Sequence, residues 1–274
     1  MCQTLKVSRS GCYAYFDLKI SNREKENNQI LEGIKKIREN KKKKTYGAPR
    51  LKEELNGKGI NCGKNRVARL MKISGIKSTI RKQWKTTTDS NHKYNICPNL
   101  LEWKGFKTET TGELITSDIT YIRTKEGWLY LAIVLDVYLR KIIGWAMSER
   151  ITQDLVLNAV KQAAMKSTFK QDAIFHSDRG SQYAANKVKE YLKEQGFKQS
   201  MSGKGNCYDN AITETFFKTL KSEFVYLESF KTRDEAKLAI FDYIEIFYNR
   251  ERRHSSLGYL SPANFETIAN EKVA

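Results

Sequence analysis

The sequence predicts an α/β domain, with a mixed sheet flanked by helices, preceded by a small all-α region. Three observations predict this division. Residues 1–110 hold 26 Lys and Arg against 10 Asp and Glu, whereas residues 111–274 hold 23 against 21. Apolar residues recur at helical spacing in the first part. The second part opens with three strand-like runs and then alternates helix with strand, an order typical of a mixed sheet covered by helices.

The charge of the whole chain indicates a polyanionic partner. The 274 residues carry a formal net charge of +18, which fits a nucleic acid better than a membrane or an acidic substrate. A generally basic soluble protein is the alternative that charge alone leaves open. The longest apolar run, residues 128–135, is too short to span a membrane. The five cysteines include no CxxC pair, which fits reduced thiols in the cytoplasm, and His92 with Cys97 lacks a second ligand pair for zinc.

Residues 1–45 are predicted as an N-terminal helical segment. Ile30, Ile34 and Ile37 recur at four- and three-residue steps and give one apolar stripe among polar residues. The basic run 41–44 that follows is interpreted as a solvated, flexible link rather than a specific contact.

Residues 46–80 are predicted to form a helix-turn-helix-like DNA-binding segment. Pro49 can open a helix, and Gly57 and Gly59 are expected to stop it. A second helix is expected over residues 64–72. The apolar positions of the two helices are Leu51, Leu55, Val67, Leu70 and Met71, and the cations that project elsewhere are Lys64, Arg66 and Arg69. Two short helices around a turn with glycine also occur as ordinary packing units, but the excess positive charge favours DNA binding.

Residues 81–110 are expected to be a linker, residues 111–265 the main domain and residues 266–274 a tail. Strands are predicted over 114–122, 128–138 and 141–147, a helix over 153–167, a strand over 173–176, a helix over 183–195, a strand from Phe197, and helices over 208–227 and 231–249. Three strands with short joins, followed by alternating helix and strand, are the order of a ribonuclease-H-like fold.

Three acids in this domain are candidate ligands for metal ions. Phosphodiester chemistry needs charge held at the attacking and leaving oxygens, which two Mg²⁺ (or Mn²⁺) ions on carboxylates can supply. Asp118 lies within a strand, where an unpaired charge is costly. Asp178 directly follows a strand, at the end where α/β sheets tend to bind ligands. Glu214 lies on the helix that begins near Tyr208.

The helix of Glu214 also carries candidate DNA contacts. Asn210, Glu214, Lys218 and Lys221 are four, four and three residues apart and therefore share one face. Each acid taken alone also fits an ordinary role, as an edge-strand charge, a turn residue or an ion-paired helix residue. Asp136 and Asp209 are rival acids, and both are interpreted as structural, the second as a helix cap.

Several separate motifs resemble one family. They are 117–122 (SDITYI), 127–131 (GWLYL), 176–183 (HSDRGSQY), 208–211 (YDNA) with Glu214, 46–51 (YGAPRL), 66–71 (RVARLM) and 254–262 (HSSLGYLSP). In this order they are similar to the IS3 family of insertion-sequence transposases. The 35 residues between Asp178 and Glu214 resemble the D,D(35)E spacing shared with retroviral integrases, and Lys221 matches the basic position of that pattern. Ser117, Gly63 and Thr215 are mild departures, and none is a candidate acid.

The resemblance implies a DDE-type polynucleotidyl transferase that cuts insertion-sequence ends and joins them to target DNA. It implies that Asp118, Asp178 and Glu214 are the catalytic residues and hold two Mg²⁺ or Mn²⁺ ions. It further implies double-stranded DNA as partner, a homo-oligomer on DNA, and an upstream-frame product that a frameshift can fuse to this one. A non-catalytic DNA-binding regulator and a general nuclease on the same fold are the competing interpretations.

Overall fold

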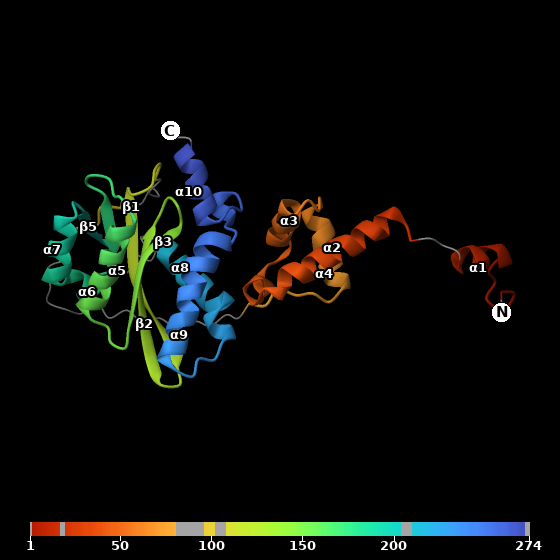
Figure 1. The fold of residues 1–274 in the computed structure, drawn as a ribbon, viewed down its shortest axis with the longest axis horizontal. Helices are drawn as coiled ribbons and strands as arrows, with labels where there is room; N and C mark the ends of the chain where they lie inside the picture. Colours follow the sequence, from red (N-terminus) through yellow and green to blue (C-terminus); the bar gives the residue numbers. More distant parts are fainter. Residues whose placement is uncertain (1, 17–19, 81–95, 102–107, 204–209, 272–274) are drawn as a thin grey trace. The chain divides into compact units, whose positions relative to one another are not determined.

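The computed structural model describes residues 2–16, 20–80, 96–101, 108–203 and 210–271. The chain divides into two compact units, residues 1–79 and residues 80–274. Figure 1 shows the helical elements of the first unit and the sheet with its helices in the second.

The first unit is all-helical. Its elements are α1 (Arg9–Phe16), α2 (Asn22–Glu39), the 3₁₀-helix η1 (Lys41–Thr45), α3 (Ala48–Gly57) and α4 (Lys64–Ile73). The side chain of Ser21 caps α2 by accepting a hydrogen bond from the backbone N–H of Glu24. The predicted apolar positions of α2, α3 and α4 are all buried and form the core of the unit. The predicted helices are therefore confirmed.

Glycines in the left-handed region end both helices of the helix-turn-helix-like segment. Gly59 has a φ of 79°, and the N–H of Ile60 bonds to the carbonyl of Leu55 at 2.9 Å. Gly75 has a φ of 66°, and the N–H of Ile76 bonds to the carbonyl of Met71 at 2.8 Å. Both are Schellman ends. The predicted stop at Gly57 and Gly59 is confirmed, since Gly57 is the last helical residue of α3 and Gly59 adopts the left-handed conformation after it.

The basic run 41–44 is not the flexible link that was expected. It forms η1, and Lys43 Nζ lies 3.2 Å from Glu54 Oε2. Arg38 donates from its Nη1 to the carbonyl of Lys44 at 2.7 Å and from its Nη2 to that of Lys77 at 2.8 Å. Glu54 is buried and needs a charged partner, so part of this run is held by specific contacts.

The second unit contains a five-stranded mixed sheet. Its strands are β1 (Leu114–Thr124), β2 (Gly127–Asp136), β3 (Lys141–Ser148), β4 (Ile174–Ser177) and β5 (Lys198–Met201), in the order β3-β2-β1-β4-β5. The pairs β1–β2 and β2–β3 are antiparallel, whereas β1–β4 and β4–β5 are parallel. This topology confirms the predicted fold class.

Helices cover both faces of this sheet. They are α5 (Gln153–Lys166), α6 (Ser181–Ala184), α7 (Asn186–Glu194), α8 (Ala211–Glu223), the 3₁₀-helix η2 (Val225–Leu227), α9 (Arg233–Phe241), the π-helix η3 (Asp242–Glu251), the 3₁₀-helix η4 (Ser255–Leu257) and α10 (Pro262–Glu271). In Figure 1, α5, α6 and α7 lie on one side of the sheet, and α8 and α9 on the other. The helix expected over 208–227 ends earlier and continues as η2, and that over 231–249 becomes a π-helix from Asp242.

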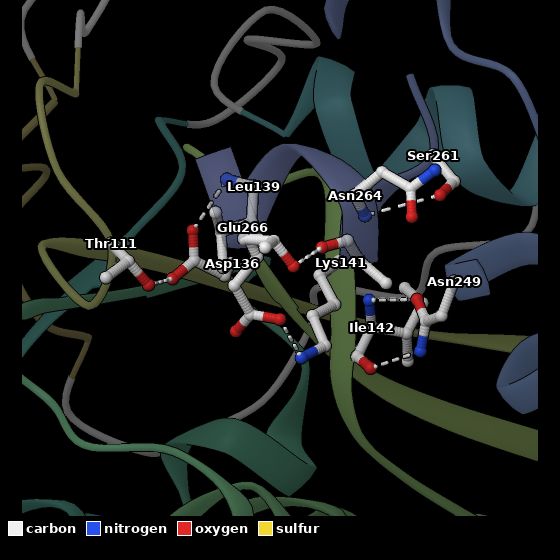
Figure 2. A network of polar contacts seen from close by, with 11 residues as sticks. Thr111, Asp136, Leu139, Lys141, Ile142, Asn249, Ser261, Asn264 and Glu266 are labelled. Carbon is white, nitrogen blue, oxygen red and sulfur yellow. Dashed lines mark hydrogen bonds and ion pairs between the residues drawn. The ribbon is translucent and has the colours of Figure 1, made fainter. Parts of the chain in front are cut away.

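Both edges of the sheet are covered. At β3 the side-chain amide of Asn249 accepts from the N–H of Ile142 at 3.0 Å and donates to its carbonyl at 2.8 Å (Figure 2). At β5 the described residues 96–101, within the expected linker, lie alongside the strand. There the N–H of Leu100 donates to Ser200 Oγ at 2.9 Å. Covering its edges prevents the sheet from pairing with other strands.

Candidate active site

The parallel pairing of β1 with β4 places two of the predicted acids side by side. Leu114 pairs with Ile174, and Thr116 pairs with His176. Two residues farther along each strand direction are Asp118 and Asp178. The pairs between β1 and β4 end at Thr116 and His176. Asp178 therefore follows the carboxyl end of β4 and lies next to Asp118 on β1. Sheets of this class tend to bind ligands at such an end.

Asp118 combines burial with the charges of the two other predicted acids. The pKa of its carboxyl is raised well above the ordinary value, first by burial and then by the negative charge of Asp178, with a smaller contribution from Glu214. The N–H of Ile119 donates to Asp118 Oδ1 at 2.7 Å, and Lys221 also favours the charged form. The charges of Asp178 and Glu214 are thus both within electrostatic range of Asp118.

Helix α8 is attached to the central strand close to Asp118. Thr213 Oγ1 donates to Thr116 Oγ1 at 2.8 Å, and both residues are buried. Glu214 follows Thr213 in the first turn of α8, and its side chain is exposed. The contact between the two threonines therefore fixes the start of the helix beside β1 and leaves Glu214 near the acids of the sheet.

Lys221 lies farther along α8 and contacts an aromatic ring. Its Nζ is 4.5 Å from the ring centroid of Tyr121, which lies on β1 as Asp118 does. Burial lowers the pKa of Lys221, and the charge of Asp118 partly opposes this effect. Lys221 is therefore a cation that the fold holds close to Asp118.

The other two candidates on α8 differ in exposure. Lys218 is exposed, whereas Asn210 is buried at the start of the helix. Within the described part of the chain, Asn210 Oδ1 has no hydrogen-bond partner. A phosphate oxygen is an acceptor, so only the amide nitrogen of Asn210 could contact DNA phosphate.

The turn after Asp178 fits its carboxylate closely. The N–H of Gly180 donates to Asp178 Oδ1 at 3.0 Å. A Cβ at position 180 would lie 3.0 Å from the same oxygen, which is tighter than an ordinary contact. The absence of a side chain on Gly180 therefore leaves room for the Asp178 carboxylate.

A buried tyrosine connects the surroundings of the two aspartates. Tyr183 Oη lies 2.9 Å from Ser117 Oγ, and Ser117 donates to the carbonyl of Ile133 at 2.7 Å. The pKa of Tyr183 is raised well above the ordinary value by burial and then by the charges of Asp118 and Asp178. This contact joins α6, which begins shortly after Asp178, to the residue that precedes Asp118.

His176 forms a second buried connection behind Asp178. Its Nδ1 lies 2.9 Å from Ser200 Oγ and its Nε2 lies 3.1 Å from Ser202 Oγ. Ser202 also donates to the carbonyl of Ser177 at 3.3 Å. These contacts tie the ends of β4 and β5 together and hold the strand end from which Asp178 extends.

The three acids are suitable ligands for a hard divalent cation, although they are not closed around one point. Among the residues that the structure describes, no group of three His, Cys, Asp or Glu side chains is close enough to hold an ion as it stands. Three carboxylates at ligand distance from one point repel one another, and a divalent cation offsets that repulsion. The oxygen-only donor set and the raised pKa of Asp118 fit such a cation.

The rival acid Asp136 has a structural role, as predicted. It accepts hydrogen bonds from Thr111 Oγ1 at 2.9 Å, from the N–H of Gly112 at 2.8 Å and from the N–H of Leu139 at 3.0 Å (Figure 2). Burial nevertheless raises the pKa of its carboxyl. Asp209 and His92 lie outside the described residues.

The predicted DNA-contacting cations of α4 do not share one environment. Lys64 and Arg69 are exposed. The guanidinium of Arg66 contacts α2, donating to Glu26 Oε2 at 2.8 Å and to Asn27 Oδ1 at 2.9 Å. Arg66 therefore fixes α4 on α2.

Four residues of the site were given no role from the sequence, although three of them lie in the quoted motifs: Thr213, Tyr121, Tyr183 and His176. A hydroxyl or imidazole at a strand or helix position is not informative alone, because its partner is distant in sequence. The polar pair Thr116 and Ser117 within an apolar strand was the available signal. Both residues turn out to hold neighbouring helices.

The mixed five-stranded sheet flanked by helices has the fold of integrase cores. The Integrase core domain family matches residues 109–207, a second Integrase core domain family matches residues 214–269, and the HTH-like domain family matches residues 25–84. The solved catalytic core domain of BIV integrase is 16% identical, with a TM-score of 0.44, over 60% of this chain and 99% of that one.

Two curated relatives are similar along nearly the whole chain. The insertion element IS600 uncharacterized 31 kDa protein of Shigella sonnei is 43% identical over 274 residues, covering 100% of both chains. Transposase InsF for insertion sequence IS3A of Escherichia coli (strain K12) is 38% identical over 268 residues, covering 97% of this chain and 92% of that protein. The chain belongs to the IS3 family of insertion-sequence transposases. In the described residues, no helix is both long and apolar enough to cross a membrane.

Proposed function

We propose that this chain catalyses metal-dependent cleavage and strand transfer at the ends of its insertion sequence. The observation that carries the proposal is the parallel pairing of β1 with β4, which sets Asp178 beside Asp118. Burial raises the pKa of the Asp118 carboxyl, and the negative charges of Asp178 and Glu214 raise it further. Accumulated charge of this kind is costly to a fold unless the site binds cations. The relatives named as transposases support a DNA substrate.

In this proposal Asp118, Asp178 and Glu214 hold two Mg²⁺ or Mn²⁺ ions. The bound ions would lower the pKa of the attacking water or 3′-hydroxyl and stabilise the leaving oxygen. Lys221, held against Tyr121, contacts the phosphate next to the cut, and Lys218 and the amide nitrogen of Asn210 extend this contact. The attacking oxygen comes from water or DNA, so no covalent bond between protein and DNA forms.

The first unit is proposed to bind the terminal repeats of the element. Lys64 and Arg69 are exposed on α4 and are suited to phosphate contacts. Arg66 serves this surface indirectly, because its contacts with α2 orient α4. Binding through phosphates should weaken steeply with salt.

The decisive experiment is strand transfer on oligonucleotides that carry the element's own ends, with Mg²⁺ or Mn²⁺ present. Asp178→Asn should reduce cleavage and joining by about a thousandfold or more, because it removes charge from the metal site. Binding to terminal DNA should stay at the wild-type level, since the first unit is unchanged.

Asp172→Asn is the matched control. Asp172 precedes β4, whereas Asp178 follows it, and the Asp172 carboxylate forms an exposed ion pair with Lys198 at 3.4 Å. Asn tolerates the φ of 62° at this position. The control should keep wild-type activity. Full activity of Asp178→Asn would refute the proposed site.

The same assay separates the two competing functions. A non-catalytic regulator would keep its effect on transposition in the Asp178→Asn variant. A general nuclease would degrade DNA of any end sequence and would yield no product joined to a new target.

A further inference from the structure

The outer end of the β1–β2 hairpin presents aromatic and cationic side chains on one face. Tyr121 of β1 pairs with Tyr130 of β2, and Arg123 pairs with Trp128. Directly paired residues of antiparallel strands point to the same face, as do residues two apart on one strand. Tyr121, Arg123, Trp128 and Tyr130 therefore form one surface, here called the hairpin surface.

The hairpin surface runs from residues packed against the core to residues exposed to solvent. Ile119 and Tyr130 pack against the core cluster beneath α5, whereas Trp128 is 42% exposed and Arg123 is exposed. In the part of the chain that the structure describes, no hydrogen bond or ion pair involves the guanidinium of Arg123. A half-exposed indole beside a free guanidinium is a combination that suits nucleotides.

The hairpin surface is held in place before any ligand binds. The rings of Tyr121 and Trp128 meet edge to face, with centroids 5.0 Å apart and an interplanar angle of 89°. Arg233 donates from its Nε to the carbonyl of Trp128 at 3.1 Å and from its backbone N–H to Glu126 Oε2 at 2.8 Å. The Glu126 carboxylate is thus engaged by α9. A rigid surface loses little entropy on binding.

The hairpin surface also adjoins the candidate active site. Lys221 Nζ lies over the ring of Tyr121, and the same lysine interacts with the charge of Asp118. Lys221 therefore links the ring of Tyr121 to the charge of Asp118, three residues earlier on β1.

We propose that the hairpin surface binds unpaired nucleotides of the DNA substrate, with Trp128 stacking on a base and Arg123 contacting the phosphates. The bases of a duplex stack on one another, so only an unpaired base can offer its face to an indole. Cationic side chains alone are enough to contact the phosphates of a duplex. A duplex would offer the exposed indole of Trp128 no base to stack on. The proposal rests on the proposed function in taking DNA as the substrate.

The test is metal-free binding of the full chain to a short single-stranded oligonucleotide and to a duplex of the same sequence. Trp128→Ala should weaken single-strand binding about tenfold, and Trp128→Phe should weaken it less, because a smaller ring still stacks. Arg123→Gln should lower the slope of log affinity against log salt by about 0.7 on the single strand. Duplex binding should change less than twofold in all three.

Phe241→Ala is the matched control. Phe241 lies on α9, is 47% exposed and meets Trp145 edge to face with centroids 5.9 Å apart, which reproduces the exposure and ring contact of Trp128. It should bind both DNAs as wild type does. Melting of each variant near the wild-type temperature would establish that the fold is intact.

Two outcomes would overturn the proposal: unchanged single-strand binding by Trp128→Ala, or an equal loss on single strand and duplex, which would indicate a duplex-backbone surface. Because no metal is present, these outcomes do not depend on catalysis. Asp178→Asn should bind the single strand like wild type even though it cannot cut, so failure of the hairpin surface and failure of the active site are distinguishable.

Discussion

Arg66–Glu26 in the first unit and Arg252–Glu223 in the second are arginine–glutamate ion pairs that each join two separate segments, and they have opposite surroundings. In the first unit Arg66 contacts Glu26 at 2.8 Å, with side-chain exposures of 26% and 59%. In the second unit Arg252 contacts Glu223 through two hydrogen bonds of 2.8 and 2.9 Å, with exposures of 5% for Arg252 and 7% for Glu223. An arginine–glutamate pair therefore joins α4 to α2 at a solvated surface in the first unit. In the second unit it joins the segment after η3 to the end of α8 in the interior.

The buried pair lies at the end of the helix that carries Glu214. Burial by itself would lower the pKa of Arg252, but the hydrogen bonds and charge of Glu223 raise it. Glu223 is the last residue of α8, and Thr213 fixes the other end of the helix. The comparison teaches that the Arg66 pair joins two helices at a solvated surface, whereas the Arg252 pair is buried at the end of the helix that carries Glu214.

The largest effect is expected from breaking the buried pair. Arg252→Ala leaves the Glu223 carboxylate buried and unpaired, so the free energy of unfolding of the second unit should fall by about 3–5 kcal/mol. All four tryptophans lie in residues 80–274, so denaturant unfolding followed by tryptophan fluorescence reports on this unit alone. A loss below about 1 kcal/mol would mean that the pair behaves like a surface pair.

Gly180→Ala tests how closely the fold surrounds Asp178. The added Cβ would press on Asp178 Oδ1, so activity at limiting Mg²⁺ should fall by about 10- to 100-fold, as when a residue next to a metal ligand is changed. Raising the metal concentration should restore much of the activity. Ser181→Ala, one residue away, is the control and should keep wild-type metal dependence.

Tyr183→Phe should have a smaller effect. It removes one buried hydrogen bond and leaves that from Ser117 to Ile133 intact, so the second unit should lose about 1 kcal/mol of unfolding free energy. Ser117→Ala should cost more, because it leaves two buried groups unpaired. Equal losses in the two variants would contradict the network described here.

The smallest effect is expected from Arg66→Ala. An exposed pair of this kind contributes about 1 kcal/mol or less, although Arg66 also contacts Asn27. Hydrogen exchange of the α4 amides should accelerate only a few-fold, with the fluorescence transition of the second unit unchanged. Complete exchange of α4 would indicate that this contact is essential to the first unit.

Much of the fold could be predicted because its signals are local. The apolar spacing of α2, α3 and α4 and the runs that became β1, β2 and β3 depend only on neighbouring residues. The element ends were harder to predict. The π-helix from Asp242 carries Asn249, which bonds to Ile142 of β3, and the ordered run 41–44 contacts Glu54 of α3, so both contacts lie outside the local sequence pattern.

The sequence by itself determined which acids could act, because residue type and position relative to a strand or helix are properties of a short stretch of chain. Only the tertiary structure decided that Asp178 follows the strand paired with that of Asp118, that Lys221 lies on Tyr121, and that Arg66 is used inside its unit. Strand register and helix packing are set by long-range contacts, which no local pattern contains.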